Sequence, residues 1–256
     1  MLPVGPGKKK RWQGSLLTSS IYWQVTYTIP HMPAHSHLPT VIQAANSLAD
    51  GLVNPSLLVT LHRDIEGLDG KDGEPLGRSS KQYALRWGIF TMTYAAVEAF
   101  FNDALSLDPS QTRHLPLNPD RLRQVGQQLG VQIFADGWGV RTRTPGAAGN
   151  RSRWRVYSGT QELQAYLADM RKLRNILSHG GDPRLVSNDS GALWPLAGGK
   201  HSMRLMGAEG FIQACCDLAA QTVLAFGGQS DDCPRWPEPG RSGLSAERPP
   251  PLALLS

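Results

Sequence analysis

The stretch RKLRNILSHGGDP, residues 171–183, combines side chains that can act on a phosphate with a pattern that ends a helix. Arginine can form two parallel hydrogen bonds with a phosphate and offset charge that develops on its oxygens. Histidine, with an ordinary pKa of about 6.5, exchanges protons near neutral pH. Arg174 and His179 are separated by four residues, and Gly180-Gly181 follows as a predicted helix C-terminus. No other stretch of the sequence points as directly to chemistry.

Arg174 falls within the apolar face of the helix expected from about residue 158 to residue 179. At about 100° per residue, the apolar side chains of this helix lie within one arc of about 120°. They are Leu163, Tyr166, Leu167, Met170, Leu173 and Leu177. Arg174 lies about 20° from Leu163, whereas His179 lies about 160° away. A regular helix therefore separates Arg174 from His179, and an unwound last turn or a second copy of the chain is needed to bring them together.

A cation on an apolar face is costly unless a partner accompanies it, because burial removes its water. Arg174 should therefore meet a carboxylate, a subunit interface or an anionic ligand. Glu98, in a long helix expected over residues 81–107, is the carboxylate that could pair with Arg174 and orient it. A solvated or interface glutamate is the alternative for Glu98, and a buried structural partner is the alternative to a catalytic Arg174.

The segment between Asp136 and Glu162 is basic and holds no acidic residue. Its arginines are Arg141, Arg143, Arg151, Arg153 and Arg155, with Trp154 among them. Guanidinium groups neutralise phosphates and aromatic rings stack on bases, so these side chains could hold single-stranded RNA. In the alternative interpretation the segment is a solvated basic loop whose aromatic side chains fold back on the helices. Either way, we expect a long irregular insertion.

The remaining sequence predicts an all-α protein, a bundle of about five helices. Apolar residues recur at spacings of three and four over residues 39–52, 54–66 and 81–107. Asn118-Pro119 predicts the start of another helix, because asparagine caps and proline fits the first turn. The last helix is expected over residues 209–226, where Cys215 and Cys216 lie among core positions.

Three segments differ in composition and divide the chain. Residues 1–38 are expected to be a disordered or misassigned extension, residues 39–228 the helical domain, and residues 229–256 a disordered proline-rich tail. The domain is long enough for a single hydrophobic core.

Composition argues against several classes of protein. Three cysteines are too few for a disulfide framework, and none has the spacing of a zinc site, so we expect no metal and no cofactor. No stretch approaches the roughly 18 apolar residues that span a bilayer, so we expect a cytoplasmic protein without a membrane partner. The formal net charge of +5 is compatible with an anionic partner.

The motif and its position resemble a known family. RNILSHG, residues 174–180, resembles the Arg-x4-6-His signature of the HEPN superfamily, in the form with four intervening residues and an asparagine after the arginine. YAAVEAFFNDAL, residues 94–105, looks like the long early helix of prokaryotic HEPN proteins associated with RNA repair, the RiboL-PSP-HEPN type. The resemblance covers about residues 40–227; the insertion at residues 142–155 and the proline-rich tail have no counterpart in it.

This resemblance implies a metal-independent endoribonuclease, usually a homodimer, in which the ribose 2′-OH attacks the adjacent phosphorus. Arg174, Asn175 and His179 would be its catalytic residues, supported by Glu98 and Ser178. A toxin or phage-defence role, with an antitoxin or defence-system partner, follows from the family alone. The alternative is a non-catalytic HEPN-like helical module that dimerises or binds RNA or a nucleotide.

Overall fold

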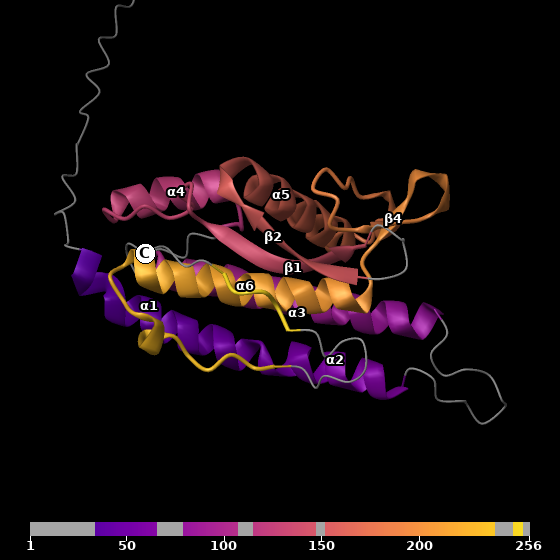
Figure 1. Ribbon diagram of the computed structural model, residues 1–256, viewed down its shortest axis with the longest axis horizontal. Helices are drawn as coiled ribbons and strands as arrows, with labels where there is room; N and C mark the ends of the chain where they lie inside the picture. Colours follow the sequence, from indigo (N-terminus) through magenta and orange to yellow (C-terminus); the bar gives the residue numbers. More distant parts are fainter. Residues whose placement is uncertain (1–33, 66–78, 107–114, 147–151, 239–247, 253–256) are drawn as a thin grey trace, which may run out of the picture. The chain divides into compact units, whose positions relative to one another are not determined.

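The computed structural model describes residues 34–65, 79–106, 115–146, 152–238 and 248–252. Most of the predicted extension, residues 1–33, and Arg151 of the basic segment lie outside the described residues. The described chain is mostly helical, as predicted (Figure 1). Its α-helices are α1 (Ala34–Gly51), α2 (Val53–Ile65), α3 (Ser79–Ala104), α4 (Pro119–Gln128), α5 (Gly159–Ser178) and α6 (Leu205–Ala225). Its other elements are strands β1 (Gly139–Pro145), β2 (Ser152–Ser158), β3 (Trp194–Pro195) and β4 (His201–Ser202) and the short 3-10 helices η1 (Pro183–Leu185), η2 (Ala197–Gly199) and η3 (Ser230–Asp232).

The helix ends follow local chemistry where the sequence predicted them. The Asn118 Oδ1 accepts hydrogen bonds from the backbone N–H groups of Asp120 at 3.0 Å and Arg121 at 3.4 Å, which caps α4. Pro119 occupies the first turn, where its missing N–H costs nothing. Both predictions for this helix start are confirmed.

Helix α1 begins five residues earlier than the predicted domain boundary at residue 39, so Pro39 lies inside it. The added turn packs on the bundle. The His37 Nε2 lies 2.9 Å from the Ala104 carbonyl oxygen, and its ring centroid lies 5.5 Å from that of Phe226. Leu38 also contacts the core. These contacts with distant residues extend the helix beyond what its own periodicity predicted.

Helices α3 and α6 form the centre of the fold, and both carry buried aromatic side chains. Helix α3 contacts α1, α2 and α6, while α6 also contacts β1. Cys215 and Cys216 of α6 are buried, as predicted, together with Phe211, Leu218, Thr222 and the C-cap residue Phe226. In Figure 1, α6 lies between α1 and α2 on one side and the strands β1 and β2 on the other.

The predicted irregular insertion is instead a β-hairpin. Strands β1 and β2 pair antiparallel, with Gly139 opposite Ser158 and Arg143 opposite Trp154. Strand β1 packs along α6. Its first residue is held there by Gln221, whose Nε2 donates to the Gly139 carbonyl oxygen at 2.7 Å and whose Oε1 accepts from the Gly139 N–H at 3.0 Å. The hairpin needs this distant helix, which local sequence does not reveal.

The described part of the predicted disordered tail also differs from expectation. Residues 229–238 include η3 and follow α6 closely, and Cys233 and Trp236 pack against the core. Further on, the Pro250 carbonyl oxygen accepts a hydrogen bond from Arg141 Nη1 at 3.0 Å. Cys233 and Trp236 therefore hold residues 229–238 against the core, and Pro250 bonds to β1, although the described part of this segment forms no long helix or strand.

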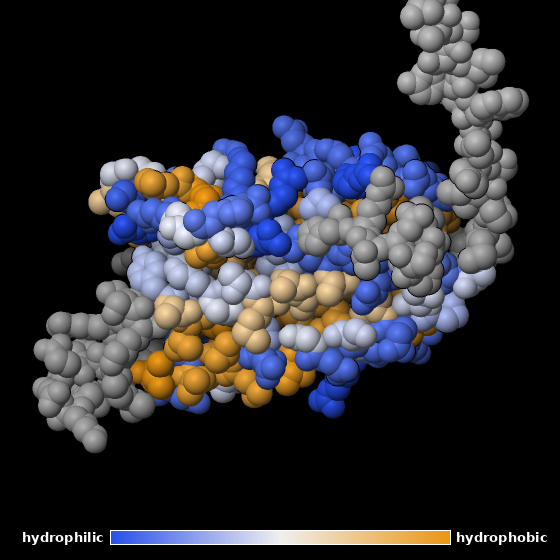
Figure 2. Space-filling view, turned by 180° about the vertical axis from the view of Figure 1, so that it is seen from behind, coloured by the Kyte–Doolittle hydropathy of each residue, from blue (hydrophilic) through white to orange (hydrophobic). Residues whose placement is uncertain are grey.

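Helix α2 exposes an apolar stripe. Val53, Leu57 and Leu61 follow one another at intervals of four residues and are 43%, 60% and 47% exposed. Met92 of α3 is 39% exposed. Figure 2 shows hydrophobic residues gathered in the lower part of the face seen from behind. The described residues thus leave one side of this helix pair exposed.

Candidate functional site

Arg174 of α5 pairs with Glu98 of α3, which is one of the two alternatives that the sequence left open for Glu98. The Arg174 Nη2 lies 3.0 Å from the Glu98 Oε2, and the Arg174 Nη1 donates to the Asn175 Oδ1 at 3.3 Å. The Arg174 side chain stays 33% exposed, whereas the Glu98 side chain is 10% exposed. The guanidinium group is therefore fixed on one side and open to solvent on the other.

Tyr94 completes the contact between the two helices. Its ring centroid lies 5.6 Å from the Arg174 guanidinium carbon, within the range of a cation–π contact. Tyr94 and Glu98 are four residues apart on α3, so they share one face of that helix. Burial and the nearby Glu98 carboxylate both raise the pKa of Tyr94. Its hydroxyl has no hydrogen-bond partner among the described residues.

The other motif residues lie at the exposed end of α5. Asn175, Ser178 and His179 are all exposed. The His179 N–H donates to the Asn175 carbonyl oxygen at 3.1 Å, and Gly180 follows with φ +69°, which glycine adopts without strain. The predicted helix end at the glycines is confirmed.

The structure brings Arg174, Asn175 and Glu98 together but does not join His179 or Ser178 to them. Helix α5 stays helical through Ser178, so an unwound last turn does not close the distance. Within the described part of the chain, no hydrogen bond links His179 to Arg174. The sequence offered two ways to bring His179 to Arg174, an unwound last turn or a second copy of the chain. Only the second is compatible with the regular end of α5.

A groove between α4 and α5 lies on the helix face that carries the exposed motif residues. It has a volume of about 330 Å³, and Asn118, Gln164, Ala168 and Arg171 are among its lining residues. Ala168 and the C-cap residue His179 are eleven residues apart, just over three full turns, so they lie on the same side of α5. Amide groups and Arg171 thus lie along the side of the helix that ends at His179.

The predicted RNA-binding arginines of β1, Arg141 and Arg143, make their contacts with other residues of the protein. Arg141 forms a bidentate ion pair with Asp217, with Nη2 2.6 Å from Oδ1 and Nε 3.0 Å from Oδ2. Arg143 is 2% exposed and lies over the Trp154 ring at 5.2 Å. Its Nη1 is 3.9 Å from a Glu209 carboxylate oxygen. These contacts also differ from the alternative interpretation, a solvated basic loop, because Arg143 is buried and Arg141 is held by Asp217.

The two described arginines of β2, Arg153 and Arg155, are more exposed than Arg143 of β1. Arg155 bonds to Glu162 at 3.1 Å and lies over the Tyr157 ring at 4.4 Å. Arg153 is exposed. Among the described arginines of the hairpin, Arg153 is therefore the best candidate for contact with RNA.

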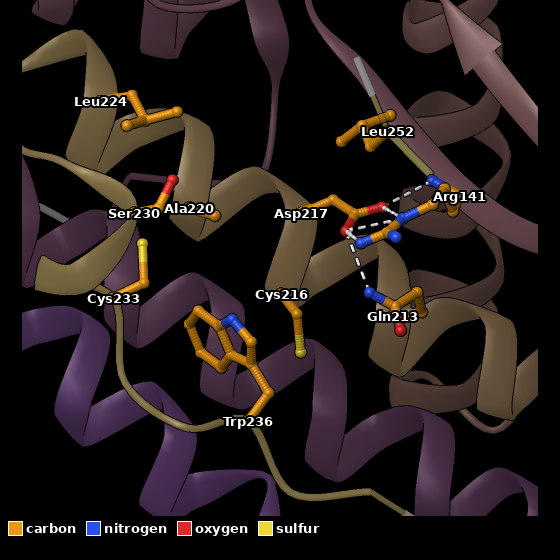
Figure 3. A pocket seen from close by; sticks show the side chains of 10 residues that line it. All are labelled: Arg141, Gln213, Cys216, Asp217, Ala220, Leu224, Ser230, Cys233, Trp236 and Leu252. Carbon is orange, nitrogen blue, oxygen red and sulfur yellow. Dashed lines mark hydrogen bonds and ion pairs between the residues drawn. The ribbon is translucent and has the colours of Figure 1, made fainter. Parts of the chain in front are cut away.

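Sequence reasoning missed a polar cluster on α6. Asp217 accepts from the backbone N–H of Arg141 at 2.7 Å, from the Arg141 guanidinium and from Gln213 Nε2 at 3.0 Å (Figure 3). Glu209, two turns earlier, is also buried. The signal was present, because two acidic residues stand among core positions of an otherwise apolar helix and so require partners.

Comparisons of this chain with protein-family models, with curated proteins and with solved structures found no match. Among the described residues, no helix is long and apolar enough to cross a bilayer. The same residues contain no group of three or more histidine, cysteine, aspartate or glutamate side chains placed to hold a metal ion.

Proposed function

We propose that the exposed end of α5 is the active site of a HEPN-type endoribonuclease. One observation carries the proposal: Glu98 fixes Arg174 through a 3.0 Å ion pair, yet 33% of the Arg174 side chain remains exposed beside Asn175. A guanidinium held in one orientation and open on one side is suited to binding an anion.

In this proposal each residue has a stated chemical task. Arg174 binds a nonbridging phosphate oxygen, and Asn175 orients the same phosphate or His179. His179 accepts the proton of the ribose 2′-OH as that oxygen attacks the phosphorus. The bond from phosphorus to the 5′-oxygen breaks, a cyclic phosphate forms, and the released oxygen takes a proton from solvent. DNA lacks the 2′-OH and should remain intact.

A homodimer is part of the same proposal. Since α5 stays regular, His179 of a second copy is the route by which a histidine reaches Arg174. A toxin or phage-defence setting, with an antitoxin or defence-system partner, is proposed on the motif resemblance alone.

Substitution of the motif residues tests the proposal. His179→Ala should abolish cleavage of total RNA while circular dichroism shows unchanged helicity, because an exposed residue after the last helical turn contributes little packing. Arg174→Lys should lower cleavage because lysine keeps the charge but lacks the planar fork that grips a phosphate. Chelator should leave the wild-type rate unchanged, since no step in the proposal uses a metal.

Arg184→Ala is the matched control for Arg174. Arg184 is an exposed arginine in η1 and is paired with Asp182 at 2.8 Å, so its loss should leave cleavage intact. A folded His179→Ala protein that cuts RNA at the wild-type rate would show that this motif is not the active site. A wild-type protein that binds RNA without cutting it would favour the alternative function, a non-catalytic RNA-binding module.

A further inference from the structure

The groove between α4 and α5 and the candidate motif share one row of side chains along α5. Its members are three or four residues apart, which places them on one side of the helix. They are Gln161, Gln164, Ala168, Arg171, Asn175 and the C-cap residue His179. The row from Gln161 to Arg171 lines the groove. The groove therefore ends where the proposed cleavage site begins.

Arg171 is the cation at the end of the groove nearest the motif. It is half-buried and forms no hydrogen bond or ion pair with another described residue. The neighbouring cations of α5 are paired. Arg174 lies 3.0 Å from Glu98, and the Lys172 Nζ lies 2.9 Å from the Asp189 carboxylate. A half-buried guanidinium without a protein partner favours an anionic ligand.

Arg171 lies beside Arg174 but faces a different space. The two residues are three apart on α5 and are therefore neighbours on its surface. Burial and Glu98 raise the pKa of Tyr94, whereas Arg174 and Arg171 both lower it, so both guanidinium groups lie near the same hydroxyl. Arg171 lines the groove and Arg174 does not. This arrangement suits two neighbouring phosphates of one strand better than a single phosphate.

Asp120 is the other charged residue that lines the groove. Its Oδ1 accepts hydrogen bonds from Arg123 Nη1 at 3.0 Å and from Gln164 Nε2 at 2.7 Å. Gln164 and Arg171 are seven residues apart, about 10 Å along the helix. The carboxylate and the free guanidinium thus mark opposite ends of the groove. A phosphate is favoured at the Arg171 end and repelled at the Asp120 end.

Amide side chains line the groove at the Asp120 end. Gln161 is exposed and makes no hydrogen bond with any residue that the structure describes. Gln164 uses its amino group on Asp120, and Asn118 uses its Oδ1 to cap α4. Each amide offers both donors and an acceptor, which suits the edge of a nucleobase. Apolar surface comes from Leu117, Pro119, Ala165 and Ala168.

We infer that this groove binds one nucleotide of a single-stranded RNA substrate, next to the nucleotide whose phosphate is cleaved. Arg171 binds its phosphate, and the amide groups of Gln161 and Gln164 bond to the base edge, which is free for such contacts in an unpaired strand. The groove volume of about 330 Å³ is at the small end of ligand pockets, which suits a single nucleotide. The inference rests on the proposed function for the identity of the ligand and adds a binding site outside the motif.

RNA binding at different salt concentrations tests the role of Arg171. The full chain with His179→Ala, which should leave RNA uncut, is titrated with a short single-stranded RNA of mixed sequence. Adding Arg171→Gln should weaken binding by about tenfold. It should also flatten the slope of log affinity against log salt by about 0.7, the value for one phosphate contact on a single strand. Arg184→Gln, which removes an exposed arginine paired with Asp182, is the matched control and should change neither quantity.

Ala168→Leu tests the groove without a change of charge. Ala168 is a half-buried residue in the row, and a larger side chain there reduces the space between Gln164 and Arg171. Leucine is nearly as favourable in a helix as alanine, so the fold should survive. RNA affinity should fall by about tenfold, as in Arg171→Gln. Ala84→Leu, at an exposed position about 21 Å along α3 from Glu98, should leave affinity unchanged. Melting temperatures confirm that each variant is folded.

Cleavage kinetics separate a flanking nucleotide from the reacting one. In a protein with His179 intact, Arg171→Gln should raise KM by about tenfold and leave kcat within about twofold, because the contact is equally strong before and during the reaction. A fall in kcat as large as the rise in KM would show that Arg171 holds the reacting phosphate, which would overturn the assignment to a flanking nucleotide.

The outcomes for the groove and for the nuclease are distinct. RNA affinity unchanged in both Arg171→Gln and Ala168→Leu would place the strand elsewhere and overturn the inference. A protein that binds RNA through the groove and never cuts it would refute the proposed nuclease alone. A protein that cuts RNA with the same KM in wild type and in both groove variants would refute this inference alone.

Discussion

Glu98 is the residue of α3 that forms an ion pair with Arg174 of the candidate motif. It lies at the boundary between the core and the surface, so its carboxylate can hold Arg174 without full burial of either charge. A partly exposed pair of this kind contributes little to stability, about 1 kcal/mol or less. Its value is therefore orientation of the guanidinium more than stabilisation of the fold.

Substitution of Glu98 by glutamine separates these two effects. Glu98→Gln keeps the size of the side chain but removes the charge that holds Arg174, so RNA cleavage at saturating substrate should fall by about tenfold. The free energy of unfolding, measured by urea denaturation, should fall by about 1 kcal/mol or less. Glu162→Gln is the matched control, because Glu162 is 49% exposed and pairs with Arg155 away from the motif. Unchanged cleavage by Glu98→Gln would mean that Arg174 needs no orienting carboxylate.

At the scale of elements, the contact between α6 and β1 decides how the hairpin is placed. Gly210 is the point of closest approach. A Cβ atom added there would lie 2.6 Å from the Thr142 Oγ1 and closer still to the Arg143 backbone nitrogen. The Thr142 hydroxyl also accepts a hydrogen bond from Tyr166 of α5 at 3.1 Å. One glycine thus lets the strand pack directly on the helix and ties three elements together.

Two glycine substitutions test this packing against helix propensity. Gly210→Ala should lower the free energy of unfolding by about 1–3 kcal/mol, because strand backbone must move away. Gly88→Ala, in the middle of α3, meets no atom within 4 Å and should raise it by up to about 1 kcal/mol, because alanine favours the helix. Chemical denaturation of both variants checks the pair. If Gly210→Ala changed the free energy of unfolding as little as Gly88→Ala, β1 could move away from α6 at little cost, and the close contact would not matter for stability.

At the scale of the whole molecule, the core buries several acids in their neutral form. Burial raises the pKa of the thiols of Cys215 and Cys216 and of the phenols of Tyr94, Tyr157 and Tyr166. In the unfolded chain these groups return to ordinary values of 9.0 for cysteine and 10.0 for tyrosine. The folded state therefore keeps protons that the unfolded state releases at alkaline pH.

This difference predicts a loss of stability at high pH. The contribution is fully present below the unfolded pKa values, and it is lost as the pH rises above about 9 towards the raised folded values. Each group costs about 1.4 kcal/mol per pH unit above its unfolded pKa. The melting temperature should therefore fall steeply between about pH 9 and pH 10.5. Cys215→Ala together with Cys216→Ala should make the fall shallower, and a flat profile in the wild-type protein would contradict the burial of these groups.

The sequence by itself determined the features that depend on residues close together in the chain. Helix periodicity identified the buried face of α5, and the glycines after His179 identified its end, because both follow from backbone geometry within a few residues. The asparagine cap of α4 is equally local. The cation on the apolar face of α5 called for a carboxylate, a subunit interface or an anionic ligand as its partner, and Glu98 was the candidate carboxylate.

Only the tertiary structure decided the features that depend on distant partners. Arginines and aromatic residues in β1 and β2 fit a loop or a strand pair equally well until α6 provides Gln221 and Asp217 as partners. The same holds for Trp236, which the sequence places in a disordered proline-rich tail, whereas in the structure it packs against the core. A hydrogen bond, an ion pair or a cavity wall joins residues far apart in the chain, and neither periodicity nor spacing encodes which of them will meet.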